Sequence, residues 1–184
     1  ALRIAEGIED SDSRAEALTG LAPHLTAEQL EEALRTARGI EDGAPRAQTL
    51  AGLAPYLTAE QLQEALRTVR GIEDGSSRAQ ALARLASRMA ELGQLEEALR
   101  TAQGIEDSSS RAQALAGLGP HLVQLPLDGL HTAFCEMLPV LASRTRSDLL
   151  SDLLALAAVI SRLGGGSAVA ETAQAIQDVS HWWP

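Results

Sequence analysis

Apolar residues recur at helical spacing along most of this chain. Leu18, Leu21, Ala22 and Leu25 stand at positions i, i+3, i+4 and i+7, a spacing that places them on one face of an α-helix. A second apolar set with the same spacing follows at residues 30–37. A short polar segment separates the two sets, so the pattern predicts a pair of helices joined by a turn.

The same helix pair recurs every 32 or 33 residues. The motif GIED begins at Gly7, Gly39, Gly71 and Gly104. The segment after each motif is also repeated, as RAEALTGLAPHL, RAQTLAGLAPYL, RAQALARLASRM and RAQALAGLGPHL. One such hairpin cannot bury its own apolar face, whereas stacked hairpins can. We therefore expect an all-α fold, a right-handed α-solenoid of stacked helix-turn-helix hairpins.

The GIED motif is interpreted as the joint between successive repeats. Gly39 weakens the end of one helix, Ile40 returns an apolar side chain to the core, and Asp42 is placed to cap the next helix. Arg46 follows Asp42 by four residues, within reach of an ion pair. The equivalent arginines are Arg14, Arg78 and Arg111. A ladder of binding arginines is the alternative interpretation.

The turn inside each hairpin has its own pattern. Thr26 and Gln29 have the spacing of a capping box at the start of a helix, and Thr58 and Gln61 repeat it. In the third repeat the segment MAELGQLEEAL replaces the threonine turn and adds one residue. We expect these turns to connect antiparallel helices.

The repeat pattern fades after Leu122. We assign residues 1–125 to tetratricopeptide-like repeats with a truncated first unit, and residues 126–184 to divergent C-terminal helices that cap the array. In that region Pro139 is expected to kink a helix and Ser147 to start the next one. This next helix should carry a buried stripe from residue 149 to residue 163, after which the segment GGGS starts a final helix.

The chain closes on HWWP. An array needs an atypical end unit to cover its last apolar face, and we expect Trp182 and Trp183 to provide that cover. A binding hot spot is the alternative for these two tryptophans.

Composition narrows the classes of function. Of the 184 residues, 45% are hydrophobic and only 2% aromatic, so the apolar content is mainly Ala and Leu, which favour helices. The net charge of −10 argues against nucleic acid and anionic membranes, which bind mainly Lys and Arg. The most apolar stretch contains Asp152 and Arg162 and is shorter than a membrane span. A single cysteine, Cys135, fits a reducing cytoplasmic setting.

The sequence contains no recognisable catalytic constellation. His24 and His121 occupy a repeat position that elsewhere holds Tyr56 and Arg88, which argues against a metal ligand there. We therefore predict no metal and no cofactor. Cys135 follows His131 by four residues, a spacing that can bring a thiol beside an imidazole on a helix. The simpler interpretation is that Cys135 is a small buried residue.

The 32–33-residue unit resembles the tetratricopeptide repeat. Residues 90–102, AELGQLEEALRTA, are most similar to it, with a Leu-Gly turn followed by Glu-Glu-Ala-Leu. The usual unit has 34 residues and is rich in aromatic residues, which are almost absent here. The pattern IEDxxxRAxALxxLAPxL and the closing AIQDVSHWWP are more specifically similar to the C-terminal helical repeats of bacterial STAND-type signalling NTPases with NACHT or NB-ARC cores.

This resemblance implies a sensor or protein-binding array, with the nucleotide site in another domain. The chain opens on ALRIAEGIED without a Met, so we expect Ala1 to fall inside a helix of an earlier repeat. The chain is then the tail of a longer protein, and ATPase activity is not expected of it.

Two classes of function remain. The first is a non-catalytic module that binds a protein or peptide, and the repeat array favours it. The second is a small-molecule receptor or enzyme with a pocket near Cys135, His131 and Trp182. The first helices of such arrays usually line the inner face, and the candidate partner-binding residues there are Gln48, Gln80, Gln113, Tyr56, Arg84 and Arg88. Arg84 and Arg88 form a positive spot that suits an acidic segment, and an ordinary solvated face is the alternative.

Overall fold

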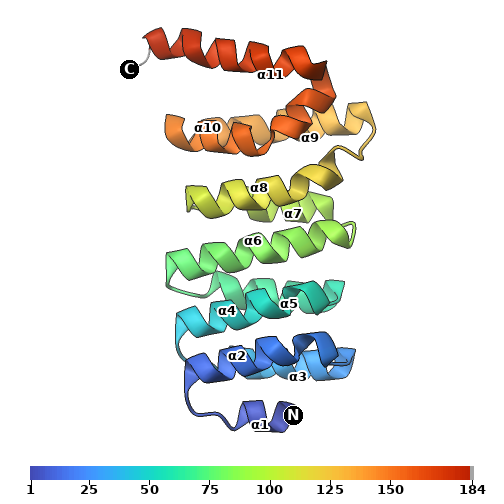
Figure 1. Cartoon of the computed structure of the whole chain (residues 1–184), viewed down its shortest axis with the longest axis vertical. Helices are drawn as coiled ribbons and strands as arrows, with labels where there is room; N and C mark the ends of the chain where they lie inside the picture. The colour runs from blue at the N-terminus through green and yellow to red at the C-terminus, as the bar shows by residue number, and fades with distance from the viewer. Residues whose placement is uncertain (183–184) are drawn as a thin grey trace.

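In the computed structural model the helices follow one another along the long axis of the molecule (Figure 1). The structure describes the backbone of residues 1–182 and the side chains of residues 1–178. Over this part the chain forms eleven α-helices, two short 3-10 helices and no strand, so the all-α prediction is confirmed. The α-helices are α1 (Leu2–Glu6), α2 (Ser11–Leu21), α3 (Ala27–Arg38), α4 (Gly43–Leu53), α5 (Ala59–Arg70), α6 (Gly75–Glu91), α7 (Leu95–Gln103), α8 (Ser108–Leu122), α9 (Leu127–Ala142), α10 (Arg146–Ala155) and α11 (Ala157–Trp182), and the 3-10 helices are η1 (Ala22–His24) and η2 (Ala54–Tyr56).

The helices form two layers. α2, α4, α6, α8 and α10 pack against one another in that order. Behind them lie α3, α5, α7 and α9 (Figure 1). Each repeat therefore contributes one helix to each layer, and equivalent residues of successive repeats face the same side of the molecule. The core between the layers consists mainly of Leu and Ala, with a few Ile, Val and Met residues.

The hairpin turns follow the sequence pattern. Thr26 accepts a hydrogen bond from the Gln29 amide and the Gln29 side chain accepts one from the Thr26 amide, and Thr58 and Gln61 form the same capping box. The third repeat has Ser87 where the first two have a proline, and its helix α6 continues to Glu91. Proline removes a helical N–H donor, and Pro23 and Pro55 lie in the 3-10 helices that follow α2 and α4, although α8 continues through Pro120 to Leu122.

Aspartates cap the first helix at three of the four joints. Asp10, Asp74 and Asp107 each accept a hydrogen bond from a serine amide three residues ahead, at 2.7 or 2.8 Å. Hydrogen bonds from the side chain and then from the amide of that serine lower the pKa of the three carboxyls below the usual value. Asp42 makes no such bond, because the residue three ahead is Pro45, which has no N–H.

The joint arginines bind main-chain carbonyls, and the predicted i,i+4 ion pairs with the capping aspartates are wrong. Arg14, Arg46, Arg78 and Arg111 each donate to the carbonyl of the isoleucine six residues earlier, over 2.6–3.2 Å. All but Arg46 also donate to the following glutamate carbonyl. The aspartate oxygens are already directed at the helix amides, so the guanidinium instead binds carbonyls of the joint.

Arg111 differs from the other joint arginines because α10 covers it. Arg111 and Asp152 are both fully buried, and the Arg111 Nε lies 3.0 and 2.8 Å from the two carboxylate oxygens. Asp148 lies 3.7 Å from the Arg111 Nη2 atom. Burial raises the pKa of the Asp152 carboxyl, and its hydrogen bonds with Arg111 oppose that rise. The repeat pattern in the sequence does not indicate this buried ion pair.

The C-terminal helices differ from the expected ones in two places. Thr145 caps α10 through the Asp148 amide, so the prediction of Ser147 as the cap is wrong. The helix expected up to residue 163 is broken at Leu156, and α10 and the described part of α11 are bent by 76°. The bend allows Leu156 and Val159 to be fully buried. Pro139 lies inside α9.

The GGGS segment interrupts α11 as expected. Gly165 adopts a φ of 74°, a left-handed conformation that glycine tolerates. The side chains of Val179 and Trp182, and all of Trp183, lie outside the described residues, so the predicted tryptophan cover stays a prediction. Among the described residues no single helix meets the length and composition of a membrane span, although the bent pair of α10 and α11 meets them together.

Small residues allow close contact between first helices. A Cβ atom added to Gly52 would lie 2.5 Å from the Thr19 Cγ2 atom and 3.0 Å from its Cβ atom. A Cβ atom at Gly20, the equivalent residue of the first repeat, would meet nothing within 4 Å. Gly52 is therefore a packing requirement of the contact between α2 and α4.

We predict opposite effects for alanine at these two glycines. Gly20→Ala should stabilise the fold by about 0.5–1 kcal/mol, because alanine favours the helix and meets no neighbour. Gly52→Ala should destabilise it, because the rigid Thr19 side chain cannot move away without disturbing α2. Urea unfolding followed by circular dichroism measures both. Equal stabilisation by the two substitutions would contradict the close packing at Gly52.

The capping aspartates give a second prediction. Asp74→Ala should lower the urea midpoint at pH 7, whereas Asp42→Ala should leave it nearly unchanged, because only Asp74 accepts a helix amide. The folded pKa of Asp74 lies below the usual value for an aspartate, which is about 3.9. Its stabilisation is therefore complete well above that value and is lost as the pH falls through the folded pKa. The difference between wild type and Asp74→Ala should disappear over that range.

The buried ion pair gives a third prediction. Asp152→Ala should destabilise the chain by about 3–5 kcal/mol, because it leaves the Arg111 charge buried without a counterion. Asp148→Ala, on the same helix, should have a much smaller effect, because Asp148 is partly exposed and more distant. Unfolding in urea compares the two variants. A similar loss for both would show that the Arg111–Asp152 pair has no special role.

Candidate functional site

A groove of about 860 Å³ crosses α4, α6 and α8 on the face made by the first helices. Alanine, glycine, serine and proline form most of its lining, with a few longer polar side chains. No leucine, isoleucine, valine, methionine or aromatic residue is among the lining residues. This composition follows from the packing, because the first helices approach one another through small residues.

Three glutamines occupy equivalent positions along the groove. Gln48, Gln80 and Gln113 each stand two residues after a joint arginine, and all three line the groove. Their side chains are exposed. None of the three side chains has a hydrogen-bond partner within the described part of the chain. The two-layer stacking therefore brings one free amide from each of three successive repeats to the same surface.

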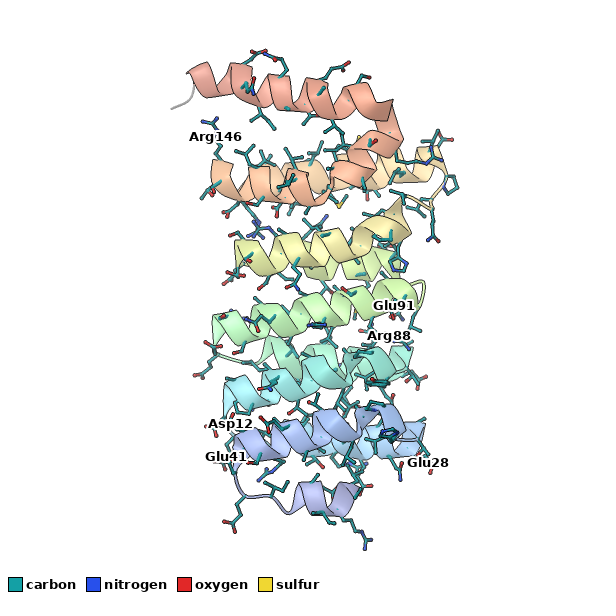
Figure 2. The ribbon with its side chains drawn as sticks, viewed as in Figure 1. Asp12, Glu28, Glu41, Arg88, Glu91 and Arg146 are labelled. Carbon is teal, nitrogen blue, oxygen red and sulfur yellow. The ribbon has the colours of Figure 1, made fainter. Side chains whose placement is uncertain are left out.

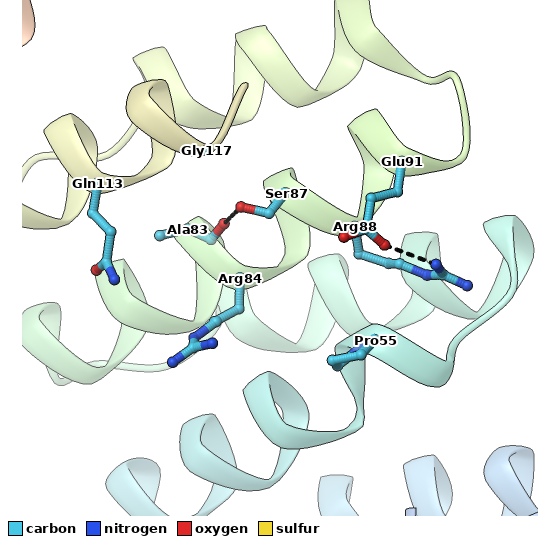
Figure 3. A pocket seen from close by; sticks show the side chains of 8 residues that line it. All are labelled: Pro55, Ala83, Arg84, Ser87, Arg88, Glu91, Gln113 and Gly117. Carbon is cyan, nitrogen blue, oxygen red and sulfur yellow. Dashed lines mark hydrogen bonds and ion pairs between the residues drawn. The ribbon is translucent and has the colours of Figure 1, made fainter. Parts of the chain in front are cut away.

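Arg84 lies in the same groove and also lines an adjoining cavity of about 260 Å³. In Figure 3 its side chain extends from α6 toward α4, and the side chain of Gln113 extends from α8 toward α6. Arg84 is exposed and makes no hydrogen bond or ion pair with the described residues. The corresponding residue of the second repeat is Gly52, so this guanidinium is particular to the third repeat.

Arg88 is bound within the protein. It pairs with Glu91 at 2.8 Å on the same helix (Figures 2 and 3). Its Nε and Nη2 atoms also lie 3.4 and 3.5 Å from the Leu57 carbonyl oxygen of the preceding repeat. Arg88 lines the adjoining cavity, but its charge is already neutralised. Of the two arginines expected to form a positive spot, only Arg84 is unpaired.

The structure thus groups most of the candidate residues. Gln48, Gln80, Gln113 and Arg84 line one groove, and Arg88 lines the adjoining cavity. Tyr56 ends the 3-10 helix η2, is 40% exposed, and is not among the residues that line either space. Tyr56 is therefore not part of the groove with the glutamines and Arg84.

Residues at the first-helix N-termini complete one side of the groove, and sequence reasoning missed them. Ser76, Ser77, Ser109 and Ser110 line it together with Asp107. Asp107 caps α8 by accepting a hydrogen bond from the Ser110 amide. The signal was present in the sequence, because serines follow the joint aspartate within three residues in these two repeats, as GSS after Asp74 and SSS after Asp107.

Cys135 and His131 do not form a recognisable catalytic site. Cys135 is exposed, so the expectation that it is a buried apolar residue is wrong. Its Sγ atom lies 3.6 Å from the His131 Nε2 atom. Neither residue lines the groove or the adjoining cavity. The Trp182 side chain, the third member of the pocket considered from sequence, lies outside the described residues.

The groove offers hydrogen-bonding groups and one positive charge. The residues that line it include no histidine, cysteine or lysine. Nowhere in the described chain do three or more His, Cys, Asp or Glu side chains gather as possible metal ligands. The polar side chains that line the groove are therefore suited to binding a polar, extended surface.

Comparison of this chain with protein-family models, with curated proteins and with solved structures finds no match.

Proposed function

We propose that this chain is a non-catalytic repeat module that binds a protein or peptide segment in the groove over α4, α6 and α8. The observation that carries the proposal is the alignment of Gln48, Gln80 and Gln113, whose exposed amides have no partners among the described residues and face one groove. Polar side chains repeated in register along a groove suit a ligand that is itself a regular polymer.

The proposal includes the finer architecture. The units stack as a right-handed, tetratricopeptide-like α-solenoid, and residues 126–184 form its divergent cap. The constant joints and the sequential packing of α2, α4, α6, α8 and α10 support this, because in solenoids each repeat contacts mainly its neighbours. The concave surface of such an array is its usual binding surface.

The proposed biological role is the sensor or interaction end of a larger bacterial signalling protein in the cytoplasm. The sequence resemblance to the C-terminal repeats of STAND-type NTPases supports this role. A groove made of polar and small residues is consistent with regulated, reversible binding, because it lacks the apolar core of permanent interfaces.

A blocking experiment tests where peptides bind. Twelve-residue peptides selected from a randomised display library on the full chain are synthesised, and their affinities are measured by fluorescence polarisation. Gln80→Trp places a bulky side chain in the groove and should weaken binding at least tenfold. Gln124→Trp, on an exposed residue outside the groove, should leave it unchanged. If no peptide binds, or if Gln80→Trp binds as well as wild type, the proposed function is wrong.

A further inference from the structure

The groove glutamines have no side-chain hydrogen-bond partner among the described residues, whereas four other glutamines do. Gln29 and Gln61 cap helices, and Gln63 donates to the Glu97 carboxylate. Gln174 donates to Asp178. The amides of Gln48, Gln80 and Gln113 make no comparable bond among the described residues. Each of them keeps two N–H donors and one carbonyl acceptor for a ligand.

The spacing of these amides fits an extended main chain. Helices packed side by side are about 8–10 Å apart, and α4, α6 and α8 are successive neighbours in one layer. An extended polypeptide covers that distance in about three residues. A peptide crossing the three helices would therefore meet one glutamine for about every three of its residues. Because the main chain carries both N–H and C=O groups, these contacts do not depend on the peptide sequence.

The lining also excludes one common type of occupant. An amphipathic helix binds through large apolar side chains that insert into apolar pockets. The residues that line this groove include no large apolar side chain. Its floor is built from small residues such as Ala47, Ala51 and Gly52, which let a ligand backbone approach closely. The groove therefore suits an extended segment better than a helix.

Arg84 makes the groove selective for negative charge at one position of the ligand. Its guanidinium lies among the amides without an ion-pair partner in the described chain, whereas nearby Arg88 is paired with Glu91. Asp107, the acidic residue in the groove lining, is bound to the Ser110 amide. A carboxylate facing Arg84 would gain a charge-assisted hydrogen bond, whereas an ammonium group there would be repelled.

From these observations we propose that the groove binds an extended acidic peptide, with Gln48, Gln80 and Gln113 bonded to its main chain and Arg84 bonded to an Asp or Glu side chain. This inference rests on the proposed function. It adds that the glutamines bind without regard to sequence and that one residue, Arg84, determines which peptides are preferred.

Peptides selected from the library on the wild-type chain test the charge preference. They should share an Asp or Glu at one position and little else. Replacing that residue with Gln should weaken binding to the wild type by about tenfold or more. The Arg84→Glu variant, selected in parallel, should instead enrich Lys or Arg at the same position. Arg67 is an exposed residue of α5 outside the groove. The Arg67→Glu variant, which reverses a charge there, should still prefer the acidic peptides that the wild type prefers.

The glutamines are tested with the same peptides. Gln48→Ala, Gln80→Ala and Gln113→Ala should each weaken binding by about threefold to tenfold, by similar factors for peptides of unrelated sequence. Gln124→Ala should have no effect. N-methylation of the peptide amides should reduce affinity at positions about three residues apart. Circular dichroism spectra and urea midpoints of the variants establish that each remains folded.

The outcomes separate the two proposals. If peptides bind and Gln80→Trp blocks them, but neither an acidic preference nor the glutamine effects are found, the present inference is overturned and the proposed function stands. Selection of peptides with a shared apolar motif that bind as a helix would also overturn the inference. If no peptide binds in the groove, both proposals fall.

Discussion

Arginine side chains hold the joints between repeats by donating hydrogen bonds to main-chain carbonyls that lie just beyond the end of a helix. A guanidinium has five N–H donors in one plane, so it can bind two successive carbonyls and still reach a neighbouring element. Arg78 lies 3.7 Å from Glu106 of the next joint, and Arg111 binds Asp152 of α10. At every joint the arginine therefore connects the loop carbonyls with the helix that follows them.

Regular joints place equivalent residues of the first helices in line. Small residues such as Gly52 and Gly117 then determine how closely these helices approach, since an added Cβ at Gly117 would lie 2.8 Å from the Ser87 Oγ atom. The groove is a consequence of this packing. Its lining includes no large apolar side chain, so polar groups such as the glutamine amides and Arg84 are available to recognise a ligand.

Local patterns predicted much of the structure. Helical periodicity identified the repeated hairpins, and the capping boxes at Thr26 and Thr58 follow from residue types at fixed spacing. The repeat register also predicted that Gln48, Gln80 and Gln113 share one surface. These features depend on residues close in sequence or on exact repetition, and both can be read from the chain directly.

Contacts between distant residues could not be predicted in the same way. Arg111 and Asp152 are 41 positions apart, and nothing in the repeat indicates that α10 covers only the last arginine. The spacing of Asp42 and Arg46 suggested an ion pair, yet the carbonyls of the joint compete more effectively for the guanidinium. Arg88 likewise donates to Glu91 and to the Leu57 carbonyl. The second of these bonds depends on how α6 packs on the preceding repeat.

The carbonyl-binding arginines also determine where this chain tolerates changes in length. The interval from isoleucine to arginine is six residues at every joint, because a longer or shorter loop would move the carbonyls away from the guanidinium. The one additional residue of the third repeat instead falls in the hairpin turn, where Gly93 adopts a φ of 81°. Insertions can therefore accumulate at the hairpin turns, at the opposite end of the helices from the joints, without changing the register of the groove.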